Sequence, residues 1–384
     1  MNGIMSSEFI KKVKKIDFVI LGVLLGLHLI STLAVYSATS STTLEGLYKN
    51  NLIYFVAFFL LMIFMSLLDY RPLVERFSPI MYGFGILLLI LLLLTGKKVN
   101  GSIRWIHIGS FEFQPSELVK VFLIFYLAKW LSRREGESLR FIRDVIPACI
   151  ISLFPAALVY KQPDMGTAII LVGICLGMLW IANIPAKQFV IGISLIVFAI
   201  VQTTVLYFTK FELLSTLLKP HQLGRIQTFL DPVNSPDGGW HVVNSMTAIG
   251  SGQLVGKGYI NGHYVHEGFI PYVYSDSIFV VIGEEFGFLG SSVLLLLYIV
   301  LIYRLVEIAM KCTDIKGAYI IVGVISMIFA QVFENIAMHI GMMPLTGISL
   351  PFVSYGGSSL LINMALIGVA QSVKIHQNRF GFID

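Results

Sequence analysis

Three carboxylates lie beside or inside one of the most apolar stretches of this sequence, "YVYSDSIFVVIGEEFGFLG", which runs from Tyr272 to Gly290. A carboxylate in such surroundings is expensive to bury, so each one needs a partner or a function. The first, Asp276, directly precedes the apolar run and has two interpretations. It could cap the helix that follows, or it could lie at the rim of a cavity, desolvated enough to act as a general base.

Glu284 and Glu285 follow deeper in the same apolar run. In a helix they would lie about 12–13 Å from the level of Asp276, on other sides of the helix, so they do not form a pair with it. We expect both to be structural carboxylates that are buried and bonded to a neighbouring helix.

Other charged residues also stand at the starts of apolar runs. Glu117 and Lys120 are spaced i,i+3 and so share one helix face. They are either a buried ion pair or a lysine presented to an anionic lipid head group. Asp164, in "KQPDMGTA", begins a helix, where capping is the simplest role. Glu334 is most simply a buried partner for another polar group.

The remaining candidates are less specific. Arg104 beside Trp105 has the composition of an interfacial anchor. Arg225 occurs in a long loop, where the sequence alone does not assign it a role. His263 and His266 have the spacing of metal ligands but no third ligand nearby, so we do not expect a metal site there.

The composition defines the elements that must position these residues. The 384 residues are 56% hydrophobic and 13% charged, with a mean hydropathy of +0.83, which excludes a soluble domain with a single core. The net charge of +5 follows the membrane topology and does not predict a nucleic-acid partner. Cys149, Cys175 and Cys312 predict neither a disulfide nor a metal thiolate site.

We therefore predict an all-α integral membrane protein of about ten transmembrane helices, in which residues 1–384 form a single polytopic domain. Lys and Arg gather in alternate connecting segments, which places both termini in the cytoplasm. The first apolar run is too long for a cleavable signal and is expected to be an anchor. The expected helices are 16–37, 50–68, 78–95, 117–132, 144–160, 165–183, 188–209, 277–303, 316–342 and 357–373.

Three segments on the outer side are unlike simple connectors. Residues 96–116 mix Gly, Arg and Trp with alternating apolar residues, which indicates a loop or half-helix in the membrane interface. Residues 210–275 are too long for a connection and too apolar for disorder, so we expect a folded extracytoplasmic cap. Residues 343–359 are rich in Pro and Gly, which suits backbone that lines a cavity. An active site is therefore expected on the outer face.

The segment "NIAMHIGMMPLTGISLPFVSYGGSS", from Asn335 to Ser359, resembles the hallmark motif of the SEDS family, which comprises RodA, FtsW and SpoVE. The resemblance extends over essentially the whole chain and is stronger to the elongation branch, RodA, than to the division branch. A sporulation role like that of SpoVE stays open. Residues flanking Asp276 depart from the family pattern, as does Asn244, where the family usually has Gln. The other matching segments are "NGSIRWIHIGSFEFQPSELVK", "QPDMGTA", "AIGSGQLVGKG" and "SDSIFVVIGEEFG".

The resemblance implies a peptidoglycan glycosyltransferase that polymerises lipid II at the outer face of the bacterial cytoplasmic membrane during cell elongation. Asp276 corresponds to the family's essential aspartate and is the expected general base. The expected substrate-binding residues are Arg104, Trp105, Glu117, Lys120, Asp164, Arg225, Ser354 and Ser358. Among these, Lys120, Arg104 and Arg225 would bind pyrophosphate, whereas Ser354 and Ser358 would shape the cavity wall.

The resemblance also implies partners and leaves alternatives open. A class B penicillin-binding protein would supply the transpeptidase, together with other membrane proteins of the elongation complex. Glu117 and Asp164 would orient the cations or contribute to a site for a divalent ion such as Mg²⁺ or Mn²⁺. The competing functions are a lipid II transporter and a non-catalytic scaffold. The absence of an inverted repeat in the sequence argues against the transporter.

Overall fold

The computed structural model describes residues 12–40, 42, 44–95, 104–108, 111–235 and 238–377. All ten predicted helices are confirmed there, and α13 continues seven residues beyond its predicted end. They are α2 (Phe18–Thr39), α3 (Leu47–Leu67), α4 (Ser78–Thr95), α5 (Pro115–Leu131), α6 (Ile146–Lys161), α7 (Met165–Ile181), α8 (Ala186–Thr209), α13 (Ile278–Met310), α14 (Ile315–His339) and α15 (Gly357–His376). Part of residues 96–116 lies outside the described residues.

Eight helical segments of the described chain are long and apolar enough to cross a membrane. Two of them gain length from the π-helical turns η1 (Leu73–Phe77) and η3 (Phe141–Val145), which precede α4 and α6. Helix α7 is apolar but has 17 residues, and α5 has 17 residues that include Glu117 and Lys120. The all-helical membrane fold is confirmed, while the number of spans and the orientation in the membrane stay predictions.

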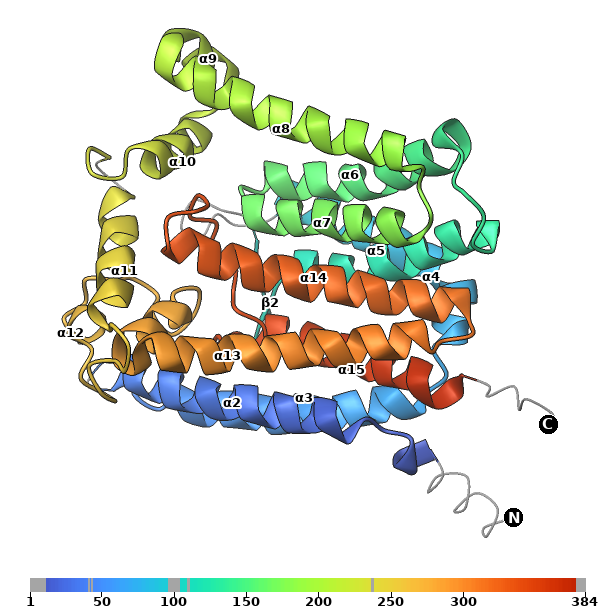
Figure 1. Ribbon diagram of the computed structural model, residues 1–384, viewed down its shortest axis with the longest axis horizontal. Coiled ribbons are helices and arrows are strands. Elements are labelled where there is room, and N and C mark those ends of the chain that lie inside the picture. The colour runs from blue at the N-terminus through green and yellow to red at the C-terminus, as the bar shows by residue number, and fades with distance from the viewer. Residues whose placement is uncertain are drawn as a thin grey trace.

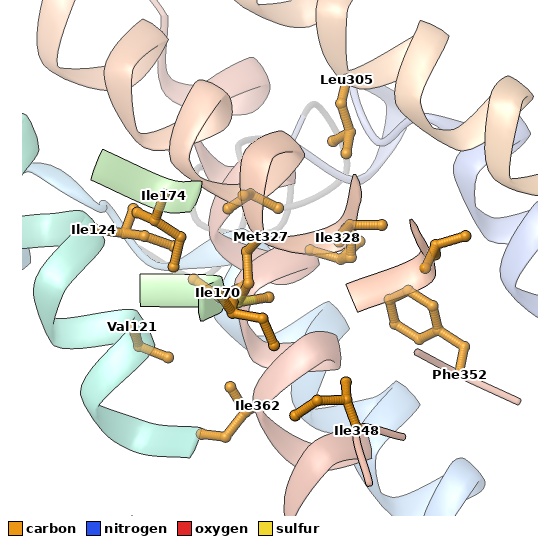
Figure 2. Packing of buried hydrophobic residues seen from close by; sticks show 14 of the residues in the cluster. Val121, Ile124, Ile170, Ile174, Leu305, Met327, Ile328, Ile348, Phe352 and Ile362 are labelled. Carbon is orange, nitrogen blue, oxygen red and sulfur yellow. The ribbon is translucent and has the colours of Figure 1, made fainter. Parts of the chain in front are cut away.

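The helices form a bundle with α5, α14 and α15 at its centre. These three helices and α13 bury more residues than the other helices do. In Figure 2, Ile124 of α5, Ile174 of α7 and Met327 of α14 lie in one cluster, so these three helices share a core. Helix α3 packs on α15, and α2 packs on α13. Helix α8 runs along the margin of the bundle in Figure 1 and buries none of its residues.

Basic side chains close one end of the bundle, where both termini lie in Figure 1. The Asp17 carboxylate caps α2 and also accepts hydrogen bonds from Arg304 at 2.5 Å and Lys374 at 2.8 Å. Lys15 Nζ donates to the carbonyl of Ile375 at 3.2 Å, near the carboxyl end of α15, where cations are favourable. Lys15, Arg304 and Lys374, which were predicted to be cytoplasmic, therefore also link α2, α13 and α15 to one another.

The segment 210–275 is folded, as predicted, and lies at the opposite end of the bundle from the termini (Figure 1). It contains four short helices. They are α9 (Phe211–Leu217), α10 (Pro220–Leu230), α11 (Gly239–Ser251) and α12 (His263–His266).

This cap is joined to α13 where that helix is interrupted. Gly287 has φ 62° and ψ −155°, which takes the backbone out of the helical conformation. The loop after α11 replaces the missing helical bonds. Lys257 N donates to the carbonyl of Glu284 at 3.0 Å, and Phe288 N donates to the carbonyl of Gln253 at 2.9 Å. The segments "GSGQLVGKG" and "GEEFGFLG" therefore bind each other through their backbones.

Replacing Gly256 by Ala is expected to weaken this contact strongly. Gly256 has φ +83°, and a Cβ there would lie 2.1 Å from the carbonyl oxygen of Glu285. We expect a loss of at least about 2 kcal/mol, since non-glycine strain alone costs about 1–3 kcal/mol, measured by thermal unfolding in detergent. The matched control is Gly250→Ala in α11, where a Cβ meets nothing within 4 Å. Equal stability of the two variants would contradict the backbone contact.

The two deep carboxylates of α13 are structural, as predicted, but most of their partners belong to the cap. Glu284 accepts from Lys257 Nζ at 2.7 Å and from the backbone N–H of Tyr264 and Val265 at 3.0 and 3.1 Å. The expectation of a neighbouring membrane helix is wrong for Glu284, because a loop folds back over it. Glu285 accepts from Ser37 Oγ of α2 at 2.5 Å and lies 3.2 Å from His266 Nε2.

Candidate active site

Asp276 lies in the turn that connects the cap to α13. The residue is half-buried, yet its Oδ1 is shielded from solvent and has no hydrogen-bond partner among the described residues. Helix α13 begins at Ile278, Ser277 occupies the N-cap position, and no side chain caps the first turn. The capping interpretation of Asp276 is therefore wrong, and its Oδ1 is left without a hydrogen-bond partner among the described residues.

The surroundings of Asp276 suit a base. Burial raises the pKa of its carboxyl group to about 6, against the opposing effects of the backbone N–H groups of Asp276 and Ser277 and of the Arg104 guanidinium. A Cβ on Gly347 would lie 3.3 Å from Oδ2, so the carboxylate faces the loop 343–356. That loop is also tied to the turn by Tyr355 N, which donates to the carbonyl of Tyr274 at 2.9 Å.

A short antiparallel pair of strands, β1 (Ile106–Ile108) and β2 (Phe111–Phe113), separates Arg104 from the start of α5. Arg104 donates to the carbonyl of Pro163 and lies 3.9 Å from Asp164 Oδ1. Its side chain is 17% exposed, so it points into the protein and is not the interfacial anchor that the sequence suggested. Among the described residues no hydrogen bond or ring contact joins Trp105, which is half-buried, to the other candidates.

Asp164 caps α7 as predicted, since its Oδ1 accepts from the N–H of Thr167 at 3.2 Å. Its Oδ2 accepts from Thr167 Oγ1 and from Gln114 Nε2, each at 3.0 Å. Both carboxylate oxygens therefore accept hydrogen bonds. The negative charge of Asp164 also attracts the Arg104 guanidinium. Asp164 thus orients the arginine and ties β2 and α5 to α7.

The predicted ion pair of Glu117 and Lys120 is confirmed. Lys120 Nζ lies 2.7 Å from Glu117 Oε1, and the lysine side chain is wholly buried. Because the ammonium has no exposure, a phosphate reaches it only if neighbouring side chains move. Glu117 Oε2 has no hydrogen-bond partner among the described residues.

Arg225 enters the site from helix α10 of the cap. Burial and the neighbouring Arg104 lower the pKa of its guanidinium, whereas Asp164, Tyr160 and Glu334 act in the opposite direction. One of its terminal nitrogens, Nη1, has no hydrogen-bond partner in the described structure. The local sequence does not predict this position of Arg225, because the residue lies 61 positions after Asp164 in the chain.

Glu334 of α14 is 1% exposed, and both of its oxygens lack a hydrogen-bond partner among the described residues. The predicted polar surroundings of Glu334 are nevertheless present, since the Thr346 side chain acts on its carboxyl group, as do the charges of Lys120 and Arg225. Its Oε1 lies against the first turn of α7, since a Cβ on Gly166 would be 2.9 Å away.

The two predicted serines, Ser354 and Ser358, hydrogen-bond to backbone groups in the described structure and not to Asp276. Ser354 Oγ accepts from the N–H of Leu350 at 2.8 Å, within its own loop. Ser358 Oγ donates to the carbonyl of Glu112 at 2.6 Å and accepts from Gln114 N at 3.3 Å. Ser358 thereby joins the start of α15 to β2.

The fit of a divalent ion to this site is poor. Among the described residues no group of three or more His, Cys, Asp or Glu side chains is placed to hold a metal. Of the two expected ligands, Glu117 is bonded through one oxygen to Lys120 and Asp164 is bonded through both. We therefore derive no step through a protein-bound ion.

Three polar residues near Asp276 were not among the sequence candidates. Asn335 and His339 of α14 both lie within hydrogen-bond distance of the main-chain carbonyl of Asp276. His241 of α11 lies 3.1 Å, through Nε2, from Ser277 Oγ, and burial lowers its pKa to about 4. The available signal was the i,i+4 spacing, which places Asn335 and His339 on one face of the predicted helix 316–342.

This fold and site define a multi-pass helical membrane protein with a polar site beneath a cap at one face of the bilayer. The family model for the FtsW, RodA and SpoVE proteins, described as "Cell cycle protein", matches residues 14–379. The chain belongs to this family, and it is a multi-pass protein of the bacterial cytoplasmic membrane.

Relatives and solved structures agree with this assignment. The chain is 36% identical to stage V sporulation protein E of Bacillus subtilis, over 76% of each chain. It is 31% identical to the peptidoglycan glycosyltransferase RodA of Treponema pallidum, over 96% of this chain and 99% of that one. It is 32% identical to the peptidoglycan glycosyltransferase MrdB of Escherichia coli K12, over 94% of each.

Two solved structures share the fold. A chain from a structure titled "Structural coordination of polymerization and crosslinking by a peptidoglycan synthase complex" superposes with a TM-score of 0.78, at 27% identity, over 95% of this chain and 99% of that one. The rod shape determining protein RodA of Thermus thermophilus superposes with a TM-score of 0.66, at 25% identity, over 95% of this chain and 98% of that one.

Proposed function

We propose that this chain is a peptidoglycan glycosyltransferase that polymerises lipid II at the outer face of the cytoplasmic membrane, in the process of cell elongation. The observation that carries the mechanism is the Asp276 carboxylate, whose Oδ1 is shielded from solvent and without a hydrogen-bond partner among the described residues, and whose Oδ2 faces a loop of the family's hallmark motif. The names of relatives aligned over nearly the whole chain support the reaction class.

In the proposed reaction Asp276 accepts the proton of the acceptor GlcNAc 4-hydroxyl. The hydroxyl oxygen attacks the anomeric carbon of the donor's muramyl sugar and forms a β-1,4 bond, with inversion. The bond from that carbon to the pyrophosphate breaks, and the electron pair leaves with undecaprenyl pyrophosphate. Glycoside hydrolysis usually needs a second carboxyl group as acid, but pyrophosphate departs without one when its charge is stabilised.

The proposed pyrophosphate site consists of Arg104, whose charge acts on Asp276, together with Arg225 and Lys120. Arg104 and Arg225 are close enough to influence each other, and Arg225 keeps an unbonded nitrogen. Asp164 holds Arg104 in place, and Glu117 holds Lys120. We assign Trp105, Ser354 and Ser358 to the walls of the substrate site. We also propose that a divalent ion such as Mg²⁺ or Mn²⁺ takes part, although the described residues do not form a site for it by themselves.

The partner that we propose is a class B penicillin-binding protein, because a structural neighbour comes from a peptidoglycan synthase complex in which polymerization and crosslinking are coordinated. Its membrane helix would dock on this bundle, and its ectodomain would contact the cap. Further membrane proteins of the elongation complex complete the expected assembly.

The test is a polymerisation assay with the purified protein, lipid II and the partner carrying an inactivated transpeptidase. Glycan strands are expected. If a folded, partnered preparation formed no strands, the glycosyltransferase would be excluded. Movement of labelled lipid II across a vesicle bilayer would then identify a transporter.

The rate of polymerisation is expected to fall at acid pH. Burial raises the pKa of Asp276 to about 6, and a base must be ionised, so the rate should drop by about tenfold per pH unit below about pH 6. Among the neighbouring groups, burial lowers the pKa of His241 to about 4, so this imidazole stays neutral over most of that range. Initial rates measured from about pH 4.5 to about pH 8 test this, and a flat profile would contradict it.

A further inference from the structure

Oδ1 of Asp276 has no hydrogen-bond partner among the described residues, but its main-chain carbonyl has two. Asn335 Nδ2 donates to the carbonyl oxygen of Asp276 at 2.7 Å, and His339 Nε2 lies 3.0 Å from the same oxygen. Both residues come from α14, one turn apart. Because no bond orients Oδ1 itself, the place of this oxygen depends on the backbone that carries it.

The protonation of His339 follows from these contacts. A carbonyl only accepts, so Nε2 carries the proton and donates to Asp276. In the neutral ring Nδ1 is then an acceptor, and Ser245 Oγ, at 3.3 Å, is placed to donate to it. His339 is wholly buried, so these bonds are not shared with bulk solvent. Helix α11, which carries Ser245, is thereby joined to the Asp276 turn through the imidazole.

Asn335 extends the same arrangement to the hallmark loop. Its Nδ2 also donates to the carbonyl of Ile348 at 2.7 Å. Two carbonyls facing one nitrogen fix the orientation of the amide, because an amide oxygen there would be repelled by both. One buried side chain thus joins the Asp276 turn to the loop that the Asp276 carboxylate faces.

We propose that Asn335 and His339 are positioning residues, which set the place of Asp276 by holding its main-chain carbonyl. This inference rests on the proposed function, in which Asp276 is the base. It predicts an effect on the chemical step and little effect on substrate binding. Misplacing a catalytic group by about 1 Å can cost about 10²-fold in rate.

The experiment compares His339→Leu with His339→Gln, which keeps an N–H donor at a similar reach. Relative to wild type, the Leu variant is expected to lower kcat by about 10- to 100-fold, with KM for lipid II within about threefold, whereas Gln should restore most of kcat. Rates are expressed per folded molecule, measured by size-exclusion chromatography and thermal unfolding. The matched control is Gln331→Leu, two turns earlier on α14, which should keep the wild-type kcat.

The outcomes separate this inference from the function on which it rests. If Asp276→Asn is inactive and His339→Leu keeps a normal kcat, the positioning role is overturned while the base stands. If His339→Gln is as impaired as His339→Leu, the N–H donor is not the determinant and the inference is also overturned. Full activity of Asp276→Asn overturns both. If the Leu variant does not fold, Asn335→Asp, which keeps the volume but replaces the donor, gives the same comparison.

Discussion

Replacing Asp276 by Asn is expected to lower the polymerisation rate by about 10²- to 10⁴-fold, the range for loss of a general base. Asn has the same shape but does not accept a proton. Because Asp276 Oδ1 has no hydrogen-bond partner in the described structure, the substitution removes no bond at that atom, and the fold should be kept. Initial rates of strand formation from lipid II, with the inactivated transpeptidase partner, measure the effect.

The same variant separates the competing functions. A non-catalytic scaffold would tolerate Asn, so a cell that depends on Asp276→Asn would keep its shape. The matched control is Asp231→Asn in the cap, where the carboxylate accepts hydrogen bonds from the backbone N–H and the side-chain amide of Asn234, three residues on. Its rate should stay close to wild type. Equal strand formation by wild type and Asp276→Asn would remove Asp276 from the mechanism and direct attention to Glu117 and Asp164.

Lys120→Met should destabilise the protein strongly. The substitution leaves Glu117 buried without the ammonium that lies 2.7 Å from it, and breaking such a pair costs about 3–5 kcal/mol. Thermal unfolding in detergent measures this loss. Lys161→Met, at an exposed position at the end of α6, is the control and should change stability by less than about 0.5 kcal/mol.

A double variant separates the structural role of the lysine from binding of pyrophosphate. Glu117→Gln with Lys120→Met removes both charges and should recover most of the lost stability, since a neutral pair of similar volume is often tolerated. If Lys120 also stabilises the leaving pyrophosphate, this stable double variant should still be slower than wild type by about 10²-fold. A stable and fully active double variant would exclude Lys120 from substrate binding.

The sequence by itself determined the features that arise from neighbouring residues. Apolar runs predicted every long helix, because the bilayer selects length and hydropathy locally. The spacing of Glu117 and Lys120 predicted their ion pair, since i,i+3 residues share a helix face whatever surrounds them. Asp164 was correctly predicted as a cap for the same reason. The hallmark motif placed the chain in its family before any contact was known.

Only the tertiary structure decided which distant residues meet. Arg225 comes close enough to Arg104 and Asp164 to be influenced by both charges, and Glu284 has its partners in the cap, because the chain folds back over one end of the helical bundle. The prediction from local position that Asp276 caps its helix was wrong, because the helix begins one residue later, at the N-cap Ser277. The hydrogen bonds of Asn335 and His339 to the Asp276 carbonyl join residues about 60 positions apart in the sequence. No periodicity encodes such a contact, because it depends on how separate helices pack against one another.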